Sequence, residues 1–347
     1  MRDDLFGKVL IGSIDSLKKS FEEFSAMPVD LEIPHEELLD HSHLHRRTIS
    51  EPVELSAHGT FDYRLERKIR FEPTDKQGWW FKRIDIDSEP VKVSHRNAYT
   101  VHESGVHNIV LRRAGDNQNY IRLIEHIIAV KLGLDIDDIM IMIDSDDPPL
   151  FDYGSMPIVD ALEKVDRKEK EKHDHCAYFG VKETVSAVWP SGSFLMVTPP
   201  DRDFALKIDC AVNFQSCIGK QRIKFAVNED TFKIGAGART NSSLKHAILC
   251  KTIGKFIPST RYLGYDKKNV LVAGKKRYLN RARLKYRGKS LEAAWHRATL
   301  DLLAAFALID DGRFVGNIIS YKANHRDDVD LVKELYKQNL LTEIKMG

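Results

Sequence analysis

A histidine and a carboxylate lie close together in the apolar, helix-favouring run AAWHRATLDLLAAF, residues 293–306. Two side chains that bind one metal ion from a regular helix are three or four residues apart, because that spacing places them on one face. His296 and Asp301 are five residues apart, which is about 140° around a regular helix. The residue that shares a face with Asp301 is Arg297. The spacing predicts an ion pair between Arg297 and Asp301, unless a π-bulge brings residues five apart onto one face.

A second acid and histidine pair occurs in IEHII, where Glu125 precedes His126. Adjacent residues on a helix point about 100° apart, so both side chains can border one cleft and do different work. One can bind a metal ion while the other acts as a general base on the metal's water. The competing interpretation is a half-exposed helix with a salt-bridged glutamate.

Two further segments carry groups that suit catalysis. The glycine-bearing stretch GAGART ends in Arg239 and Thr240 and can present N–H groups and a hydroxyl to an oxyanion, or it can be a flexible turn. It lacks the spacing of a phosphate-binding P-loop. The stretch YKANH places Lys322 and His325 just past a predicted strand, where a loop can deliver them to a cleft.

Two histidine-bearing segments are weaker candidates for a metal site. His41, His43 and His45 alternate in a polar segment without a carboxylate partner, and HDHC, residues 173–176, lies in a charged stretch. Polar, charged surroundings of this kind favour solvated side chains over a closed metal site. We therefore expect neither segment to bind a metal ion.

Composition limits the class of protein. The 347 residues are enough for two ordinary domains, and a net charge of +2 makes no electrostatic case for a nucleic-acid partner. Four scattered cysteines without a CxxC pair suit reduced thiols. The first residues lack the features of a signal peptide, and no apolar run approaches the ~20 residues of a transmembrane segment. These features predict a cytoplasmic protein.

The pattern of elements predicts an α+β protein with two similar domains. Residues 1–48 form a separate helical and polar extension, which is a candidate for binding a protein partner. Residues 49–165 begin with strand patterns and end with helices, and residues 181–347 repeat this order, with a long helix over 289–309. The charged stretch 166–180 is predicted to be the linker between them, and its residues 166–175 are predicted to be structureless.

Taken in order, these motifs resemble those of one family. SAHG resembles an early GLHSG turn, FKRIDID a strand with the pattern FRR-D-L, and IRLIEHIIAVKLGLDIDDIMIMI a helix bearing VEHLL with its following strand. DDPPLFDYGSMPIVDAL is similar to EVPIMDGSAGPFV, GARTN to ARTF, ATLDLL to the end of an HKxxD helix, and YKANH to KSGH. The family is the zinc-dependent UDP-3-O-acyl-N-acetylglucosamine deacetylases, which carry out the committed step of lipid A synthesis.

The resemblance implies a fold and a set of roles. The family fold has two α+β domains, each a sheet covered by helices, with the helices packed between the two sheets and the active site at the domain junction. The implied roles are the general base at Glu125, zinc ligands at His126 and Asp301, the oxyanion-stabilising hydroxyl at Thr240 and the proton donor at His325. Lys322 matches the lysine of KSGH, and Arg239 and Lys322 are candidates for binding substrate.

The resemblance also has departures at the metal site. The second zinc histidine of the family falls on Arg297, the lysine after it on Ala298, and the aspartate that supports the acid histidine on Ala305. Arginine stays protonated and cannot be a zinc ligand. We therefore expect zinc to be absent or weakly bound, in a catalytically impaired relative that binds a nucleotide-sugar or acyl ligand or regulates lipid A synthesis.

The alternative is an active, divergent zinc-dependent deacetylase that hydrolyses the acetamide of a UDP-3-O-acyl-N-acetylglucosamine. In that case His126, Asp301 and either His296 or His325 hold the zinc, and Glu125 is the base. The version with His296 needs the π-bulge, because only a π-bulge places His296 and Asp301 on one face.

Overall fold

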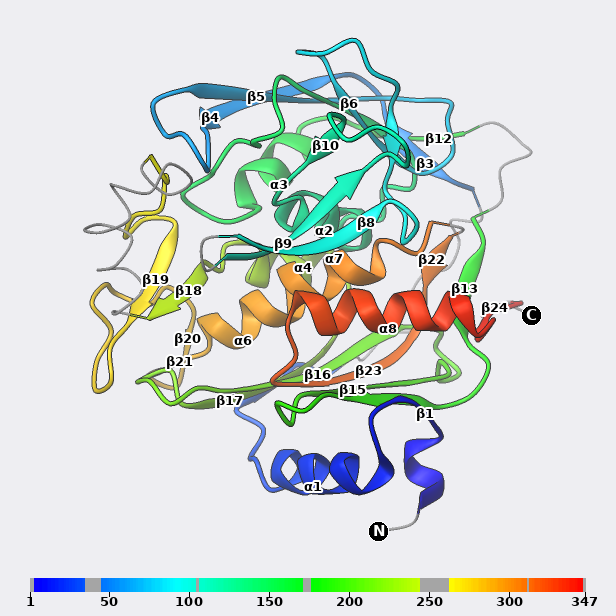
Figure 1. Ribbon diagram of the computed structural model, residues 1–347, viewed down its shortest axis with the longest axis vertical. Coiled ribbons are helices and arrows are strands. Elements are labelled where there is room, and N and C mark those ends of the chain that lie inside the picture. Colours follow the sequence, from blue (N-terminus) through cyan, green and yellow to red (C-terminus); the bar gives the residue numbers. More distant parts are fainter. Residues whose placement is uncertain are drawn as a thin grey trace.

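Two mixed β-sheets lie on either side of a layer of helices in the computed structural model (Figure 1). The structure describes residues 3–34, 45–103, 106–170, 176–243, 262–310 and 312–345. The predicted α+β architecture, with helices packed between two sheets, is confirmed. The two sheets matter for the candidate site because each of them contributes side chains that lie next to the helices.

The first sheet has five strands. In order across the sheet they are β4 (Val53–His58), β5 (Glu66–Glu72), β11 (Ile139–Ile143), β6 (Trp79–Arg83) and β7 (Val91–Lys92). In the central strand β11, Ile139, Ile141 and Ile143 are buried and the methionines between them are half-buried, as the period of two requires. A smaller sheet joins β8 (Ala98–Glu103), β9 (Val106–Arg112) and β10 (Tyr120–Ile121).

The second sheet has seven strands. In order they are β1 (Lys8–Ile11), β14 (Val185–Val188), β15 (Phe194–Thr198), β23 (Gly316–Tyr321), β16 (Leu206–Asn213), β17 (Lys220–Ala226) and β2 (Leu31–Glu32). Strand β23 is central, antiparallel to β15 and parallel to β16. Because β23 ends at Tyr321, it positions the loop that carries Lys322 and His325.

Short strands complete the fold, and one of them corrects a prediction. The pairs are β3 (Arg47–Ile49) with β12 (Arg167–Glu169), β18 (Thr240–Ser243) with β19 (Val270–Ala273), and β20 (Lys285–Tyr286) with β21 (Lys289–Ser290). Strand β13 (Tyr178–Val181) joins β22 (Arg313–Phe314) and β24 (Leu341–Glu343). The stretch 166–175, predicted to be structureless, therefore contains β12.

Charge misled that prediction because a short edge strand needs only backbone pairing and leaves its charged side chains in solvent. The domain boundary placed in this stretch stays a prediction. His41, His43 and residues 173–175 lie outside the described residues. Cys176, the last residue of HDHC, is buried, with its Sγ 3.4 Å from Asp137 Oδ1.

The helices between the sheets converge on one buried helix. They are α2 (Glu125–Gly133), α3 (Met156–Leu162), α4 (Glu229–Ala236), α6 (Glu292–His296), α7 (Leu303–Phe306) and α8 (His325–Lys337). A π-helical segment, Arg297–Leu302, joins α6 to α7, and we call this segment the π-turn. All residues from 292 to 306 are buried except Asp301, which is half-buried. A helix that is buried on all sides must find a partner for each polar group it carries.

The N-terminal extension packs on this chain's own second sheet. The extension begins with the 3-10 turn Asp3–Phe6, and its strands β1 and β2 form the two edges of the second sheet. Helix α1 (Ile14–Ser25) covers the face of this sheet that is opposite the other helices (Figure 1). Leu17 and Phe24 of α1 are buried against Phe194 and Tyr321. The extension was a candidate for binding a protein partner, but the apolar face of its helix α1 is covered by the second sheet of the same chain. No helix in the described ranges is long and apolar enough to cross a membrane.

We expect Phe24→Ala to lower the free energy of unfolding by about 3–5 kcal/mol, because it removes a buried aromatic ring from the contact between α1 and the sheet. Phe24 is 2% exposed. Glu22→Ala, at an exposed position of the same helix, is the matched control and should cost less than about 0.5 kcal/mol. Urea denaturation measures both. Equal stability of the two variants would contradict an extension that is part of the folded core.

Candidate active site

The π-turn brings His296 and Asp301 onto one face of the buried helix. Backbone bonds in a π-helix run between residues five apart, so residues at this spacing stack above one another. His296 Nδ1 is 3.2 Å from Asp301 Oδ1. The expectation that the two side chains diverge by about 140° is wrong, because it assumed a regular α-helix. The alternative with a π-bulge is the one the structure has.

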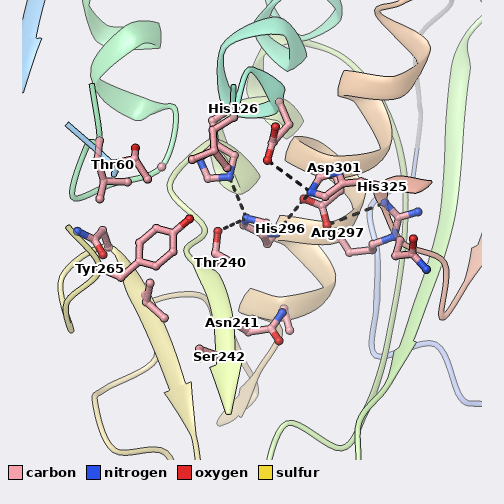
Figure 2. Close-up of a pocket in the computed structure, with 18 of the residues that line it drawn as sticks. Thr60, His126, Thr240, Asn241, Ser242, Tyr265, His296, Arg297, Asp301 and His325 are labelled. Carbon is pink, nitrogen blue, oxygen red and sulfur yellow. Dashed lines mark hydrogen bonds and ion pairs between the residues drawn. The ribbon is translucent and has the colours of Figure 1, made fainter. Parts of the chain in front are cut away.

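His126 and Thr240 approach the other side of the His296 ring. The Nε2 atoms of His126 and His296 are 3.1 Å apart, and Thr240 Oγ1 lies 3.0 Å from His296 Nε2 (Figure 2). His126 comes from α2 and Thr240 from the first residue of β18. Three segments that are far apart in the sequence therefore meet at a single imidazole.

His325 and Glu125 complete the cluster on the side of Asp301. His325 Nε2 is 3.4 Å from Asp301 Oδ1 and 3.7 Å from Glu125 Oε1. The second oxygen of Glu125 accepts a hydrogen bond from the backbone N–H of Ile109 at 3.2 Å. The predicted residues Glu125, His126, Thr240, Asp301 and His325 thus lie in one place, together with His296.

Local backbone geometry explains how Glu125 and His325 reach the cluster. Each is the first residue of its helix, α2 or α8. The backbone before each helix passes through the left-handed region, at Leu123 (φ 50) and Lys322 (φ 53). Asn324 then caps α8 by accepting hydrogen bonds from two N–H groups of its first turn. Such strained positions persist where the surrounding structure determines them, and they cluster at functional sites.

The buried setting shifts the pKa values of the site. Burial raises the pKa of Glu125 to about 8, and the charge of Asp301 acts in the same direction. Burial and the neighbouring His296 lower the pKa of His126 to about 3, so this imidazole is neutral near pH 7. Burial opposes ionisation of Asp301, but His296, His325 and Arg297 together hold its pKa well below the usual range. The site therefore contains a neutral histidine beside an ionised carboxylate, with a second carboxyl group that titrates near pH 8.

Arg297 points away from this cluster, toward Asp328 of α8. Its guanidinium makes two hydrogen bonds to the Asp328 carboxylate, one of them at 2.7 Å, whereas Asp301 Oδ2 is 4.0 Å away. Burial opposes its charge, but Asp328 more than offsets this and raises the pKa of Arg297 above its ordinary value. The predicted pair with Asp301 is therefore the weaker of two contacts. The reason is again the π-turn, which stacks Asp301 beside His296, five residues earlier, and not beside Arg297, four residues earlier.

The donor set at the centre suits a zinc ion, which takes nitrogen and oxygen ligands from His and Asp. Two imidazole nitrogens on one tetrahedral zinc lie about 3.3 Å apart, and the observed separation of the Nε2 atoms of His126 and His296 is 3.1 Å. Asp301, however, contacts Nδ1 of His296, on the other side of the ring. Accordingly, in the described ranges no three His, Cys, Asp or Glu side chains are arranged to hold a metal ion. For His126, His296 and Asp301 to meet at one ion, one of these side chains would have to rotate.

The two predicted substrate-binding residues have other partners. Arg239 is 2% exposed, and its guanidinium pairs with Glu292 at 2.7 Å. It also donates to the carbonyls of Lys267 and Arg281, and it is not among the residues that line the cavity, so its position gives no support to its predicted role. A buried arginine needs acceptors for all its N–H groups, and the carboxylate of Glu292 together with these two carbonyls supplies them. Lys322 does line the cavity, and its Nζ pairs with Glu23 of α1 at 2.9 Å.

A cavity of about 500 Å³ opens beside the cluster. One wall carries the titratable groups described above, and the other walls are largely apolar: Leu123, Pro148, Pro149, Leu150, Phe151, Ile158, Val212 and Val270. Thr60, Asn241, Ser242 and Tyr265 add hydroxyl and amide groups (Figure 2). Sequence reasoning missed these four, because isolated polar residues in loops and short strands carry no pattern. A cavity of this size and character fits a ligand with a polar head and an apolar chain.

We expect Asp328→Asn to lower the free energy of unfolding by about 3–5 kcal/mol, because it leaves the buried Arg297 without its anion. Asp330→Asn, at a half-buried position of the same helix, is the matched control. It weakens a surface pair with Arg326 and should cost less than about 1 kcal/mol. Chemical denaturation at pH 7 measures both variants. Similar costs for the two would contradict a dominant Arg297–Asp328 pair.

We expect the stability of the metal-free protein to fall between pH 4.5 and pH 8 through Glu125. Its pKa is raised to about 8 in the folded chain and is near 4.3 in the unfolded chain, so the folded state binds more protons over this range. Glu125→Gln removes this pH-dependent contribution to the free energy of unfolding. Relative to the natural protein, the variant should therefore become more stable by up to about 4 kcal/mol as the pH rises from 4.5 to 8. Denaturation at both pH values in the presence of a chelator measures the difference. A difference that does not change with pH would refute the raised pKa.

The sequence of this chain is similar to those of known deacetylases. A UDP-3-O-acyl-N-acetylglucosamine deacetylase of Aliarcobacter butzleri is 26% identical over 307 residues, which cover 86% of this chain and 92% of the relative. The corresponding proteins of Syntrophotalea carbinolica and Syntrophus aciditrophicus are 28% and 27% identical, over 61% and 65% of this chain. The match spans 64% and 66% of the length of these two relatives.

The family model of the UDP-3-O-acyl N-acetylglycosamine deacetylases matches residues 46–337. This range begins next to β3 and ends with α8, so it contains every residue of the cluster and leaves out the N-terminal extension. The chain belongs to the UDP-3-O-acyl N-acetylglycosamine deacetylase family.

Proposed function

We propose that this protein is an active, zinc-dependent deacetylase that hydrolyses the acetamide of a UDP-3-O-acyl-N-acetylglucosamine. The observation that carries the proposal is the π-turn, which stacks Asp301 beside His296, brings His296 Nε2 to 3.1 Å from His126 Nε2 and leaves Arg297 paired with Asp328. A zinc-free protein was expected because Arg297 falls on the position of a metal ligand in the family pattern. In the proposal His296 takes that role, and the π-turn absorbs the additional residue between it and Asp301.

The residues that would hold the zinc are His126, His296 and Asp301, two imidazoles and one carboxylate. When bound, zinc lowers the pKa of a bound water toward ~7 and polarises a carbonyl oxygen. The low pKa of His126 keeps its lone pair available at neutral pH, and the low pKa of Asp301 keeps its negative charge. Both ligands are thus in the protonation state that metal binding requires.

Glu125, Thr240 and His325 supply the remaining chemistry. The Glu125 carboxylate accepts a proton from water as the water oxygen attacks the acetyl carbon. The Thr240 hydroxyl donates a hydrogen bond to the oxygen that becomes negative in the tetrahedral intermediate. His325 donates a proton to the amide nitrogen as the carbon–nitrogen bond breaks, which yields acetate and the free amine. The raised pKa of Glu125 lies near the working pH, where a group that gains and loses a proton is most effective.

The cavity supports the proposed class of substrate. Its apolar walls, with Leu150, Phe151 and Ile158 among them, suit an acyl chain, while the polar side chains beside Thr240 suit a sugar. The relatives from Aliarcobacter butzleri and Aquifex aeolicus are both named UDP-3-O-acyl-N-acetylglucosamine deacetylase, and the latter is 26% identical over 70% of this chain. A substrate with a sugar nucleotide head and an acyl chain accounts for both kinds of wall.

A zinc-free binding protein is the second candidate. The observation that favours it is the contact between Asp301 and His296 Nδ1, which withdraws the carboxylate from the side of the ring that faces His126. Ala305 is fully buried and offers no carboxylate to His325. In this candidate the cluster is a self-satisfied polar network, and the cavity binds a nucleotide-sugar or acyl ligand without turnover.

We expect the purified protein to bind about one zinc per chain and His296→Ala to lose it, because one of three protein ligands is removed. His95→Ala, which removes a histidine stacked on Tyr336 away from the cluster, should leave the zinc content unchanged. Metal analysis after gel filtration measures the stoichiometry. Glu125→Gln should keep the zinc and lower kcat at least ~100-fold, since it removes the base.

Two results would decide for the second candidate. They are a zinc content near zero in the natural protein after incubation with zinc, and no release of acetate from a UDP-3-O-acyl-N-acetylglucosamine. Binding of that compound without turnover would then assign the cavity to ligand recognition alone.

A further inference from the structure

A strongly basic segment lies outside the active site. Of the 23 residues from 267 to 289, ten are lysine or arginine and none is aspartate or glutamate. The whole chain has a formal net charge of +2, so the residues outside this segment together carry −8. Such a separation of charge creates a local positive potential that the total charge conceals. We call residues 267–289 the basic segment.

The cations of the basic segment face solvent, and few of them are neutralised. Nine of the ten are exposed, and only Arg283 is half-buried. Two have a carboxylate within ion-pair distance among the residues that the structure describes: Lys268 with Asp152 at 3.9 Å, and Lys289 with Asp30 at 2.7 Å. The remaining charge is therefore available to an anion outside the chain.

Two tight turns carry much of this charge. In the first, Gly274 N–H donates to Arg277 O at 3.0 Å, and Lys275 and Lys276 form the tip. In the second, strands β20 and β21 are joined by Arg287 and Gly288, both with positive φ, as a two-residue hairpin turn requires. A Cβ on Gly288 would have no atom within 4 Å, so this tip extends into solvent.

The two turns border one shallow hollow of about 290 Å³. Leu279 and Arg281 line it after the first turn, and Lys285 and Gly288 line it at the second. Leu279 is 39% exposed, and Tyr286, at the hairpin, is 36% exposed. Cations interspersed with exposed aliphatic and aromatic side chains are typical of surfaces that lie at a membrane interface.

The basic segment is next to the cavity. Asn269 and Val270, which line the cavity, belong to it. Figure 1 shows β18, β19, β20 and β21 grouped along one side of the molecule, beyond the start of α6. A surface that binds here would thus hold the cavity close to it.

We propose that the basic segment docks on the surface of a membrane that contains anionic phospholipid. Charge complementarity selects a polyanion, and the exposed Leu279 and Tyr286 favour a lipid interface over a purely polar partner such as nucleic acid. The proposal rests partly on the proposed function, since a substrate with an acyl chain is an amphiphile that concentrates at such a surface. Docking places the cavity where this substrate is most abundant.

The test is sedimentation of the full chain with vesicles of phosphatidylcholine alone, or of phosphatidylcholine with roughly 30% phosphatidylglycerol, which gives the vesicle a negative surface potential. We expect binding to the anionic vesicles only, weakened by salt. Each basic residue near an anionic surface strengthens binding about five-fold. The triple variant Lys275→Gln, Lys276→Gln and Arg277→Gln should therefore bind about 100-fold more weakly.

The matched control is Lys68→Gln, Lys164→Gln and Lys337→Gln, which removes the same charge from exposed positions on other elements. It should bind as the natural protein does. No binding to anionic vesicles, equal weakening in both triple variants, or tighter binding to a short RNA than to the vesicles would each overturn the proposal. Vesicle binding needs no turnover, so a protein that docks but releases no acetate would refute the proposed function and leave this inference standing.

Discussion

The π-turn is the feature on which the candidate site depends. The helix that contains it is buried on nearly all sides, so each polar side chain that it carries needs a partner. In a regular α-helix Asp301 would share a face with Arg297, whereas the π-turn stacks it beside His296 and leaves Arg297 to Asp328 of α8. A difference of one backbone residue thus decides which side chain is the closer partner of Asp301.

Contacts with three other helices and one hydrogen bond of its own hold this turn in place. Asp328 of α8 binds Arg297, and Lys131 of α2 donates to the carbonyls of Ala307 and Ile309 that end the helix. Within the turn, Thr299 Oγ1 donates to Trp295 O at 2.6 Å. Helix α4 comes close because Gly235 has no side chain; a Cβ there would overlap Thr299. The surrounding helices therefore determine a conformation that a single isolated helix would not keep.

Where the sequence departs from the family pattern, other charged residues of the chain lie close to the changed position. Ala305 lacks the carboxylate that the resemblance places beside the acid histidine, and Asp301 and Glu125 are the carboxylates nearest to His325 here. Arg297 stands beside His296 and takes its counter-charge from Asp328, three residues after His325. This pair couples the start of α8, and hence His325, to the turn that carries His296. The ion pair between Arg297 and Asp328 thus links the residues of the site to the helix beside it.

The sequence by itself determined which residue types are available and the order of the elements, because apolar periodicity and short motifs are local properties. It placed Glu125, His126, Thr240, Asp301 and His325 in the candidate site and predicted the layer of helices between two sheets. It could not decide between a regular helix and a π-turn, since their apolar patterns are the same in a helix that is buried all round. The partners of Arg297 and Arg239 were also hidden, because Asp328 and Glu292 are 31 and 53 residues away and only tertiary packing brings them close. Tertiary structure alone therefore decided that His296 faces the cavity, because contacts from three other helices, α2, α4 and α8, select the conformation of the turn.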